Sequence, residues 1–184
     1  MPVIAATAPA LPRCGADGYA PFAANAEHRA LEERPDGRTD ADLAFMAAAI
    51  AEAERGAAEG GVPIGAALVE DGAVVATGRN RRVQGGDPIA HGEMDCLRAA
   101  GRRRGYRRTT LYTTLSPCMM CAGAIVQFGI PRVVVGENAT FGGNEEFLRS
   151  RGVEVVVLGD ARCEALMRRF QAERPDIWDE DIME

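Results

Sequence analysis

The feature that most constrains the fold is an alternation of short β-branched runs with amphipathic helical segments along the chain. Strands that are separated by helices need crossover connections, and these favour parallel pairing. The first two runs, Ile64–Glu70 and Ala73–Gly78, differ because they flank Asp71-Gly72, a pair typical of a tight hairpin turn. We therefore expect an α/β fold with a five-stranded mixed sheet and helices on both faces, a three-layer α/β/α sandwich.

The periodicity of the apolar residues sets the boundaries of the predicted elements. Thr39 and Asp42 form a helix-start signature, which predicts a first helix from Thr39 to about Glu59, before the hairpin. The other predicted strands are Thr110–Leu115, Arg132–Glu137 and Val153–Leu158, and the other predicted helices are Pro88–Ala100, Pro117–Phe128, Asn144–Ser150 and Ala161–Glu173.

Length and composition indicate one globular domain. The chain has 184 residues, of which 47% are hydrophobic and 26% are charged. Residues 1–38 are rich in Ala, Pro, Gly and Arg without apolar periodicity, so we expect a poorly structured N-terminal extension before a domain over residues 39–184. The apolar runs are shorter than the roughly 20 residues of a membrane helix, and no secretory leader is recognisable. A cytoplasmic protein without membrane contacts is therefore expected.

The charged residues and the cysteines exclude several kinds of chemistry. The net charge of −6 argues against a general nucleic-acid surface. All 21 basic residues are arginines, so lysine Schiff bases and a phosphate-loop lysine are excluded. His28 and His91 are the only histidines, and the odd number of cysteines favours free thiols or a metal site over disulfides.

Two short motifs carry the candidate chemistry: His91-Gly92-Glu93, and Ser116-Pro117-Cys118 with Cys121 one helical turn later. H-x-E together with P-C-x-x-C is the signature of zinc nucleobase deaminases. One imidazole (His91) and two thiolates (Cys118 and Cys121) would bind one zinc ion per chain and leave its fourth position for water. This ligand set neutralises the zinc charge, so Glu93 can stay close without binding the metal.

Under this hypothesis Glu93 is the catalytic acid and base. It would take a proton from the activated water and deliver protons to the ring nitrogen and to the departing ammonia, so that a C–N bond is hydrolysed. Residues two apart do not share a face of a regular helix, so His91 and Glu93 must lie at an irregular helix entry. Gly92 between them would allow a close approach of substrate or backbone. Ser116 and Pro117 are predicted to be the N-cap and first residue of their helix.

Two features have simpler alternatives. A structural zinc site would need a fourth protein ligand, and Cys96 could supply one. The arginines between Arg102 and Arg108 are predicted to form a solvated loop, with a local anion site as the alternative.

From about Thr39 onward the chain resembles the fungal-type cytosine deaminases of the cytidine and deoxycytidylate deaminase superfamily. The resemblance implies a cytidine-deaminase-like fold, a homodimer, and hydrolysis of cytosine to uracil and ammonia in pyrimidine salvage. Besides His91-Gly92-Glu93, the matching stretches are GGVPIG at 60–65, TTLYTTLSPCMMC at 109–121, GIPRVVVGEN at 129–138, and Glu173-Arg174-Pro175 followed by Trp178 and Asp181.

The same resemblance implies the substrate contacts. Asn80 would hydrogen-bond the pyrimidine edge, and Asp181 would lie near the leaving amine. Trp178 and Asp181 would belong to a C-terminal segment that caps the pocket. The side chains that would enclose the ring are Ile64, Phe141 and Trp178, and Gly92 and Ser116 complete the expected contacts.

The chain also departs from the fungal pattern. Asp179 follows Trp178 where the fungal enzymes have Phe, and Met94-Asp95-Cys96 replaces a small apolar and hydroxyl pair. The Asp179 carboxylate could accept from an additional substrate amine, or it could face solvent. The first case would favour another small amino-heterocycle, of the isocytosine, aminotriazine, creatinine or guanine type.

Two further functions compete with a free-base deaminase. A tRNA adenosine deaminase shares the zinc site, but such enzymes typically carry H-A-E, E-P-C and a basic face. A non-catalytic zinc module predicts four protein ligands and a dispensable Glu93.

Overall fold

The computed structural model describes residues 37–182. The predicted extension over residues 1–38 therefore lies almost wholly outside the described residues, as do Cys14 and His28. Arg38 Nη1 donates to the Leu158 carbonyl at 3.1 Å, so a residue just before the first helix already contacts the domain. No helix between residues 37 and 182 has the length and apolar character needed to cross a membrane.

Five strands form one mixed sheet: β1 (Gly65–Glu70), β2 (Ala73–Arg79), β3 (Thr109–Leu115), β4 (Arg132–Glu137) and β5 (Glu154–Val157). Their order is β2-β1-β3-β4-β5, with β1 antiparallel to both neighbours and β3, β4 and β5 parallel. Asp71 and Gly72 have φ angles of 51° and 76°, as the twist of a two-residue hairpin turn requires. The predicted mixed sheet and its hairpin are confirmed.

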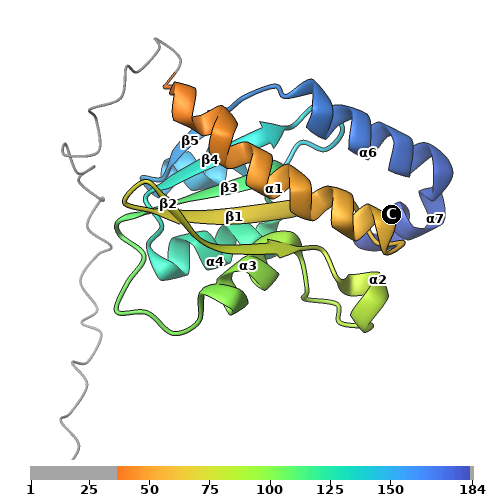
Figure 1. The fold of residues 1–184 in the computed structure, drawn as a ribbon, viewed down its shortest axis with the longest axis horizontal. Helices are drawn as coiled ribbons and strands as arrows, with labels where there is room; N and C mark the ends of the chain where they lie inside the picture. Colours follow the sequence, from red (N-terminus) through yellow and green to blue (C-terminus); the bar gives the residue numbers. More distant parts are fainter. Residues whose placement is uncertain (1–36, 183–184) are drawn as a thin grey trace, which may run out of the picture.

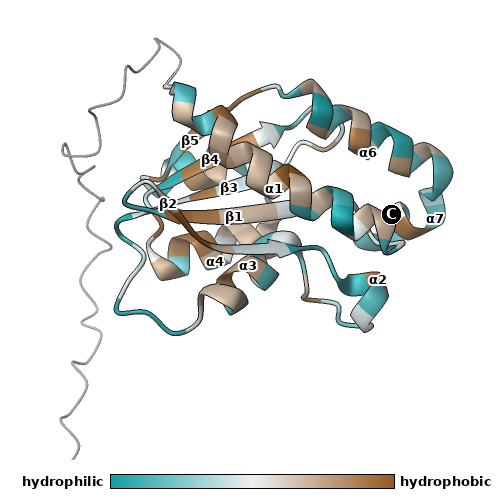
Figure 2. Cartoon of the chain, in the orientation of Figure 1, coloured by the Kyte–Doolittle hydropathy of each residue, from teal (hydrophilic) through white to brown (hydrophobic). Residues whose placement is uncertain are grey.

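Helices cover both faces of this sheet (Figure 1). One face packs on α1 (Asp40–Ala58) and α6 (Ala161–Glu173), and the other packs on α3 (Gly92–Ala100), α4 (Met119–Phe128) and α5 (Glu145–Ser150). Successive side chains of β1 point to opposite faces of the sheet, so Leu68 packs in one core and Ala67 in the other. Figure 2 accordingly shows mainly hydrophobic strands between helices of mixed colour. The three-layer sandwich is confirmed.

The topology gathers several chain segments at one edge of the sheet. β1 begins where β2 and β3 end, because Gly65 pairs with Arg79 and Ala66 pairs with Thr113. β4 runs parallel to β3 and so ends at the same edge. The residues that precede β1 and follow β2, β3 and β4 therefore lie close together, at the edge where open α/β sheets commonly bind ligands.

Two predicted helix starts are wrong. The helix predicted from Pro88 begins at Gly92 with His91 as its N-cap, since the Ala90 carbonyl accepts from Arg81 N at 2.8 Å instead of starting a helix. The helix predicted from Pro117 begins at Met119, with Cys118 as its N-cap.

The physical reason lies in the backbone around Pro117. Ser116 N donates to the Glu137 carbonyl at 3.1 Å, and the Pro117 carbonyl accepts from Asn144 N at 3.2 Å. These bonds tie Ser116 and Pro117 to the end of β4 and to the residue before α5, so they are not the N-cap and first residue of the helix, which begins at Met119.

Two short helices were not predicted: α2 (Arg82–Gly85) and α7 (Pro175–Ile182). α2 is a single turn of four residues, which is too short to show apolar periodicity. α7 follows α6 directly, and Pro175 at its first position is a residue that helix starts accept. α7 is the C-terminal segment expected to cap the pocket.

A buried carboxylate joins α1 to the sheet. The Thr39 and Asp42 side chains form the predicted capping box, which is therefore confirmed. Asp42 also accepts hydrogen bonds from Tyr112 OH at 2.8 Å and from Arg132 Nη1 at 2.9 Å. Burial alone would raise the pKa of Asp42, but the hydrogen bonds from Arg132 and the Thr39 backbone outweigh it and lower the pKa. Asp42 is thus an ionised buried group that connects α1 to β3 and β4.

We predict that Asp42→Asn lowers the free energy of unfolding by about 3 kcal/mol at pH 7, because it leaves the Arg132 charge without its buried partner. Since the folded-state pKa of Asp42 is depressed, its stabilisation is present above the unfolded pKa of about 3.9 and is lost as the pH falls below that value. The difference between parent and variant should therefore shrink in acid. Urea unfolding at pH 7 and below pH 4 measures both effects.

Glu154→Gln is the matched control, because Glu154 Oε1 pairs with the same arginine at 3.1 Å but its side chain is 48% exposed. It should change the free energy of unfolding by less than about 1 kcal/mol. An Asp42→Asn variant as stable as the parent at pH 7 would contradict this account of the network.

Candidate active site

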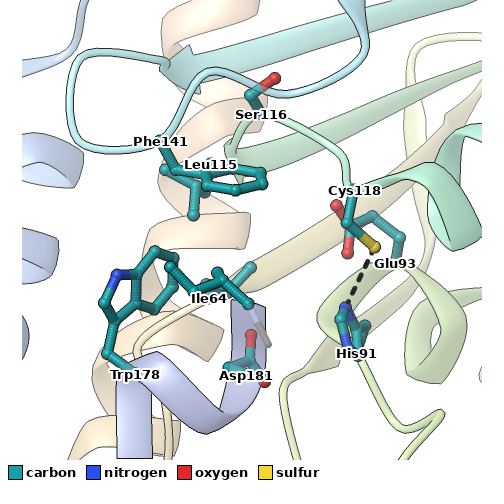
Figure 3. Close-up of a pocket in the computed structure, with 10 residues that line it drawn as sticks. Ile64, His91, Glu93, Leu115, Ser116, Cys118, Phe141, Trp178 and Asp181 are labelled. Carbon is teal, nitrogen blue, oxygen red and sulfur yellow. Dashed lines mark hydrogen bonds between the residues drawn. The ribbon is translucent and has the colours of Figure 1, made fainter. Parts of the chain in front are cut away.

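Three side chains with nitrogen and sulfur donors meet where α3 and α4 begin. His91 is the N-cap of α3, Cys118 is the N-cap of α4, and Cys121 lies in the first turn of α4. One ligand atom from each lies within 4.8 Å of the other two. The Cys118 Sγ to His91 Nδ1 distance is 3.5 Å (Figure 3). The residues predicted as zinc ligands are therefore close enough to share one ion.

The chemistry of this donor set fits zinc. The hydrogen bond from Cys121 lowers the pKa of Cys118 to about 4, against the opposing effect of burial and with help from His91. The pKa of Cys121 is raised, because its S–H donates to Cys118 and is buried. One thiolate is thus already favoured, and a cation bound between the sulfurs would replace the remaining thiol proton. Two sulfurs and an imidazole are a ligand set that zinc prefers.

A fourth protein ligand is lacking in the described part of the chain. His91, Cys118 and Cys121 are its only cluster of potential metal ligands. Cys96 is fully buried in the core, and its Sγ lies 3.6 Å from the Ala76 carbonyl. The fourth-ligand role considered for Cys96 does not fit this geometry. Three protein ligands are typical of a catalytic zinc, which keeps a position for water.

Glu93 is buried and lies beside His91 and Cys118 (Figure 3). Its Oε1 accepts a hydrogen bond from the Thr113 hydroxyl of β3 at 3.0 Å. Burial raises the pKa of Glu93, and the Cys118 thiolate adds to this effect. A carboxyl group with a raised pKa can both accept and return a proton near neutral pH. His91 and Glu93 flank the first residue of α3, which is the irregular helix entry that their spacing required.

A cavity of about 150 Å³ opens beside these groups. Leu115 and Ser116 come from the end of β3, Ile64 precedes β1, and α7 closes the opposite side (Figure 3). The rings of Phe141 and Trp178 meet edge to face, with centroids 5.8 Å apart and an interplanar angle of 87°. The lining residues are Ile64, His91, Glu93, Leu115, Ser116, Cys118, Phe141, Trp178, Asp181 and Ile182.

Five of the expected substrate contacts line this cavity: Ile64, Ser116, Phe141, Trp178 and Asp181. Asn80 lies next to it, since its backbone N donates to the Ile64 carbonyl at 2.8 Å. Asn80 is completely buried, and its Nδ2 has no hydrogen-bond partner among the described residues. An unpaired buried donor is costly, so this amide points to an acceptor on a bound molecule.

Three other residues lie elsewhere. Gly92 is not part of the cavity wall, because it packs on the residue that precedes β1: a Cβ on Gly92 would lie 3.0 Å from the Ile64 carbonyl oxygen. Asp179 is exposed on α7 and does not line the cavity. Asp95 accepts from Arg79 N at 3.2 Å and therefore faces β2. The geometry gives the carboxylates of Asp95 and Asp179 no direct contact with a ligand in the cavity.

Some residues of the site were missed by sequence reasoning. Thr113 could have been found, because the alternation along β3 places it on the same face as Leu115. Glu137 is buried and accepts from Ala139 N at 2.7 Å, which shapes the loop that carries Phe141. No local pattern marks Glu137 as a loop anchor, because this contact depends on how the chain turns after β4.

Comparison with known proteins places these features in a family. The family described as the cytidine and deoxycytidylate deaminase zinc-binding region matches residues 39–137. A cytosine deaminase of Candida albicans is 48% identical over 146 residues, covering 78% of this chain and 97% of that protein. A tRNA-specific adenosine deaminase of Streptococcus pyogenes is 37% identical over 134 residues, covering 71% of this chain and 78% of that protein.

A solved structure of a guanine deaminase from Nitrosomonas europaea has the same fold. It has a TM-score of 0.61 and 26% sequence identity, over 77% of this chain and 87% of that chain.

We predict that the purified protein holds about one zinc per chain, bound by two sulfurs, one nitrogen and one water oxygen. Cys121→Ala should lose most of the metal, whereas Cys96→Ala should retain it. Elemental analysis measures the metal content, and X-ray absorption measures the ligand set. Four protein ligands, or full zinc content in Cys121→Ala, would be inconsistent with an open site made by this trio.

Proposed function

Because the chain belongs to the cytidine and deoxycytidylate deaminase family, we propose that it converts free cytosine and water to uracil and ammonia. The enzyme class is that of a zinc-dependent hydrolase acting on a C–N bond. The observation that carries the proposal is the buried Glu93 beside three potential zinc ligands at the wall of a base-sized cavity. The 48% identity to a cytosine deaminase, over 97% of that protein, supports cytosine as the substrate.

The proton transfers fall to Glu93. A zinc ion held by His91, Cys118 and Cys121 would supply a water that is readily deprotonated near neutral pH. The Thr113 hydroxyl binds one oxygen of the Glu93 carboxylate and so fixes its orientation. Glu93 takes a proton from water and passes it to the ring nitrogen while the remaining hydroxide adds to the ring carbon that bears the amine. Glu93 then takes the proton of this added hydroxyl and delivers it to the amine, which leaves as ammonia. The oxygen of water ends as the new carbonyl of the ring, so the reaction balances.

Binding of the base would use groups on both sides of the cavity. The free Nδ2 of Asn80, which lies behind the cavity wall next to Ile64, would donate to the carbonyl oxygen of cytosine. Asp181, which lines the cavity, would accept from its exocyclic amine. Phe141 and Trp178 would enclose the faces of the ring. A polar edge recognised inside an apolar enclosure is typical of sites for small heterocycles.

The alternatives have less support. A tRNA adenosine deaminase needs access for a nucleotide within a polynucleotide, whereas α7 covers this cavity, and the net charge of −6 opposes RNA binding. Another amino-heterocycle would be favoured if Asp179 accepted from an additional substrate amine. Asp179 is exposed and lies outside the cavity. The remaining groups suit cytosine without a further donor.

The resemblance to cytosine deaminases also leads us to propose a homodimer that acts in pyrimidine salvage in the cytoplasm. Met119 and Phe128 on α4 are 57% and 46% exposed, and they are apolar side chains that a second copy could cover. The four cysteines of the described residues are free thiols, which suits a reducing compartment.

We predict that Glu93→Gln lowers the rate of ammonia release from cytosine by about 10²- to 10⁴-fold, because it removes the group that transfers protons. Zinc content and the thermal unfolding midpoint should match those of the parent, since glutamine keeps the size of the side chain and can still accept from Thr113. Turnover within tenfold of the parent would show that Glu93 is not the general acid and base.

A further inference from the structure

Arg82 contacts two of the polar groups placed at the base-binding site. It is the first residue of α2, and it reaches Asn80 through its backbone and Asp181 through its side chain. We propose that Arg82 is a positioning residue that holds α7 closed over the cavity and sets the orientation of both groups. This inference rests on the proposed function, because the orientations of Asn80 and Asp181 matter only if both side chains bind a free base.

The side-chain contact joins segments that are far apart in the sequence. Arg82 Nη1 is ion-paired with Asp181 Oδ1, 99 positions along the chain. The side chains of Arg82 and Asp181 are only 13% and 5% exposed. Arg82 Nη2 also approaches Glu180 Oε1 at 3.4 Å, but the Glu180 side chain is 74% exposed, where an ion pair contributes little. The buried pair with Asp181 is therefore the effective ionic connection.

Apart from this ion pair, α7 is attached to the domain by apolar side chains. It has eight residues, and Trp178 is the only one of them that is buried. Trp178 packs in a cluster that includes Leu115 and Phe170. A helix of this length is not stable by itself in water, so it depends on its tertiary contacts. Trp178, with the partly buried Ile177 and Ile182, supplies the apolar contacts of α7, and Arg82 supplies the ionic one.

Loss of the Arg82 guanidinium would act on α7 through Asp181. A buried carboxylate without a partner pays a large desolvation cost. Because α7 lies at the surface, it can relieve this cost by moving outward until Asp181 is hydrated. Such a movement would withdraw Trp178 and Asp181 from the cavity together, since both lie on α7.

The backbone contact acts on the other side of the cavity. Arg82 N donates to Asn80 Oδ1 at 3.1 Å, so the amide oxygen is occupied and Nδ2 is left free. Asn80 is completely buried, and a flip of its amide would lose this bond. Arg82 thus fixes both the donor of Asn80 and the acceptor of Asp181. Closure of α7 is therefore coupled to the orientation of the Asn80 amide.

The first test measures α7 in the zinc-loaded, full-length protein without substrate. Arg82→Gln should accelerate amide hydrogen exchange in residues 175–182 by about tenfold or more, while the amides of β3 and β4 exchange as in the parent. Trp178 is the only tryptophan of the chain, so acrylamide quenching of its fluorescence should rise in parallel. Arg81→Gln is the matched control, because Arg81 is the exposed neighbour with the same charge, and it should leave both signals unchanged.

A double variant tests the cause of opening. If the unpaired charge of Asp181 drives α7 outward, adding Asp181→Asn to Arg82→Gln should restore much of the protection of residues 175–182. Protection that stays low in the double variant would overturn the electrostatic explanation.

The second test is kinetic. Arg82→Gln should raise the KM for cytosine by about tenfold or more, with a smaller change in kcat, because binding is impaired while Glu93 and the zinc ligands stay in place. Arg82→Lys should recover part of the KM, since it keeps the charge without the planar fork. A purely structural role for Arg82 would lower the unfolding midpoint without this division between KM and kcat.

The outcomes separate this inference from the proposed function. Suppose that the parent enzyme deaminates cytosine, and that Arg82→Gln has the same KM and the same hydrogen-exchange protection of α7 as the parent. This result would overturn the role of Arg82 and leave the proposed function standing. A parent enzyme that deaminates no free base, with α7 still released in Arg82→Gln, would overturn the proposed function and leave the role of Arg82 in closure supported.

Discussion

The site depends on one constraint: the first turns of α3 and α4 must lie close enough for His91, Cys118 and Cys121 to share a metal ion. Pairing of β1 with β3 fixes the end of β3, from which the chain runs directly to Cys118. Close packing of α3 on β2 requires Gly78, where a Cβ would lie only 2.1 Å from the backbone N of Cys96. The spacing of the zinc ligands is therefore a property of the sheet and not of a flexible loop.

The same sheet edge gives the site its low polarity. Ile64 and Leu115 arrive from neighbouring strands, and Phe141 and Trp178 complete an apolar wall around Glu93. Burial raises the pKa of Glu93, which suits a group that must both take and return protons near neutral pH. Enclosure, acid–base chemistry and metal binding thus arise from the same convergence of strand ends.

Periodicity and motif spacing predicted most of this architecture. The mixed sheet, the hairpin at Asp71 and the meeting of His91 with the two cysteines follow from local patterns. The start of α4 was misplaced because Ser116 N donates to the Glu137 carbonyl and Asn144 N donates to the Pro117 carbonyl, and these partners lie far along the chain. The role of Arg82 was not predictable for the same reason, since an ion pair across 99 positions leaves no periodic signal.

The central claim is that the cavity admits a free base and excludes its larger derivatives. The most direct test compares kcat/KM for ammonia release from cytosine, cytidine, guanine and an RNA stem-loop with an unpaired adenosine. The account predicts that cytosine exceeds every other substrate by more than about 100-fold, because Trp178, Asp181 and Ile182 of α7 line a cavity of about 150 Å³ and a ribose on the ring would have to displace them. Comparable turnover of cytosine and cytidine, or faster deamination of the RNA, would contradict it.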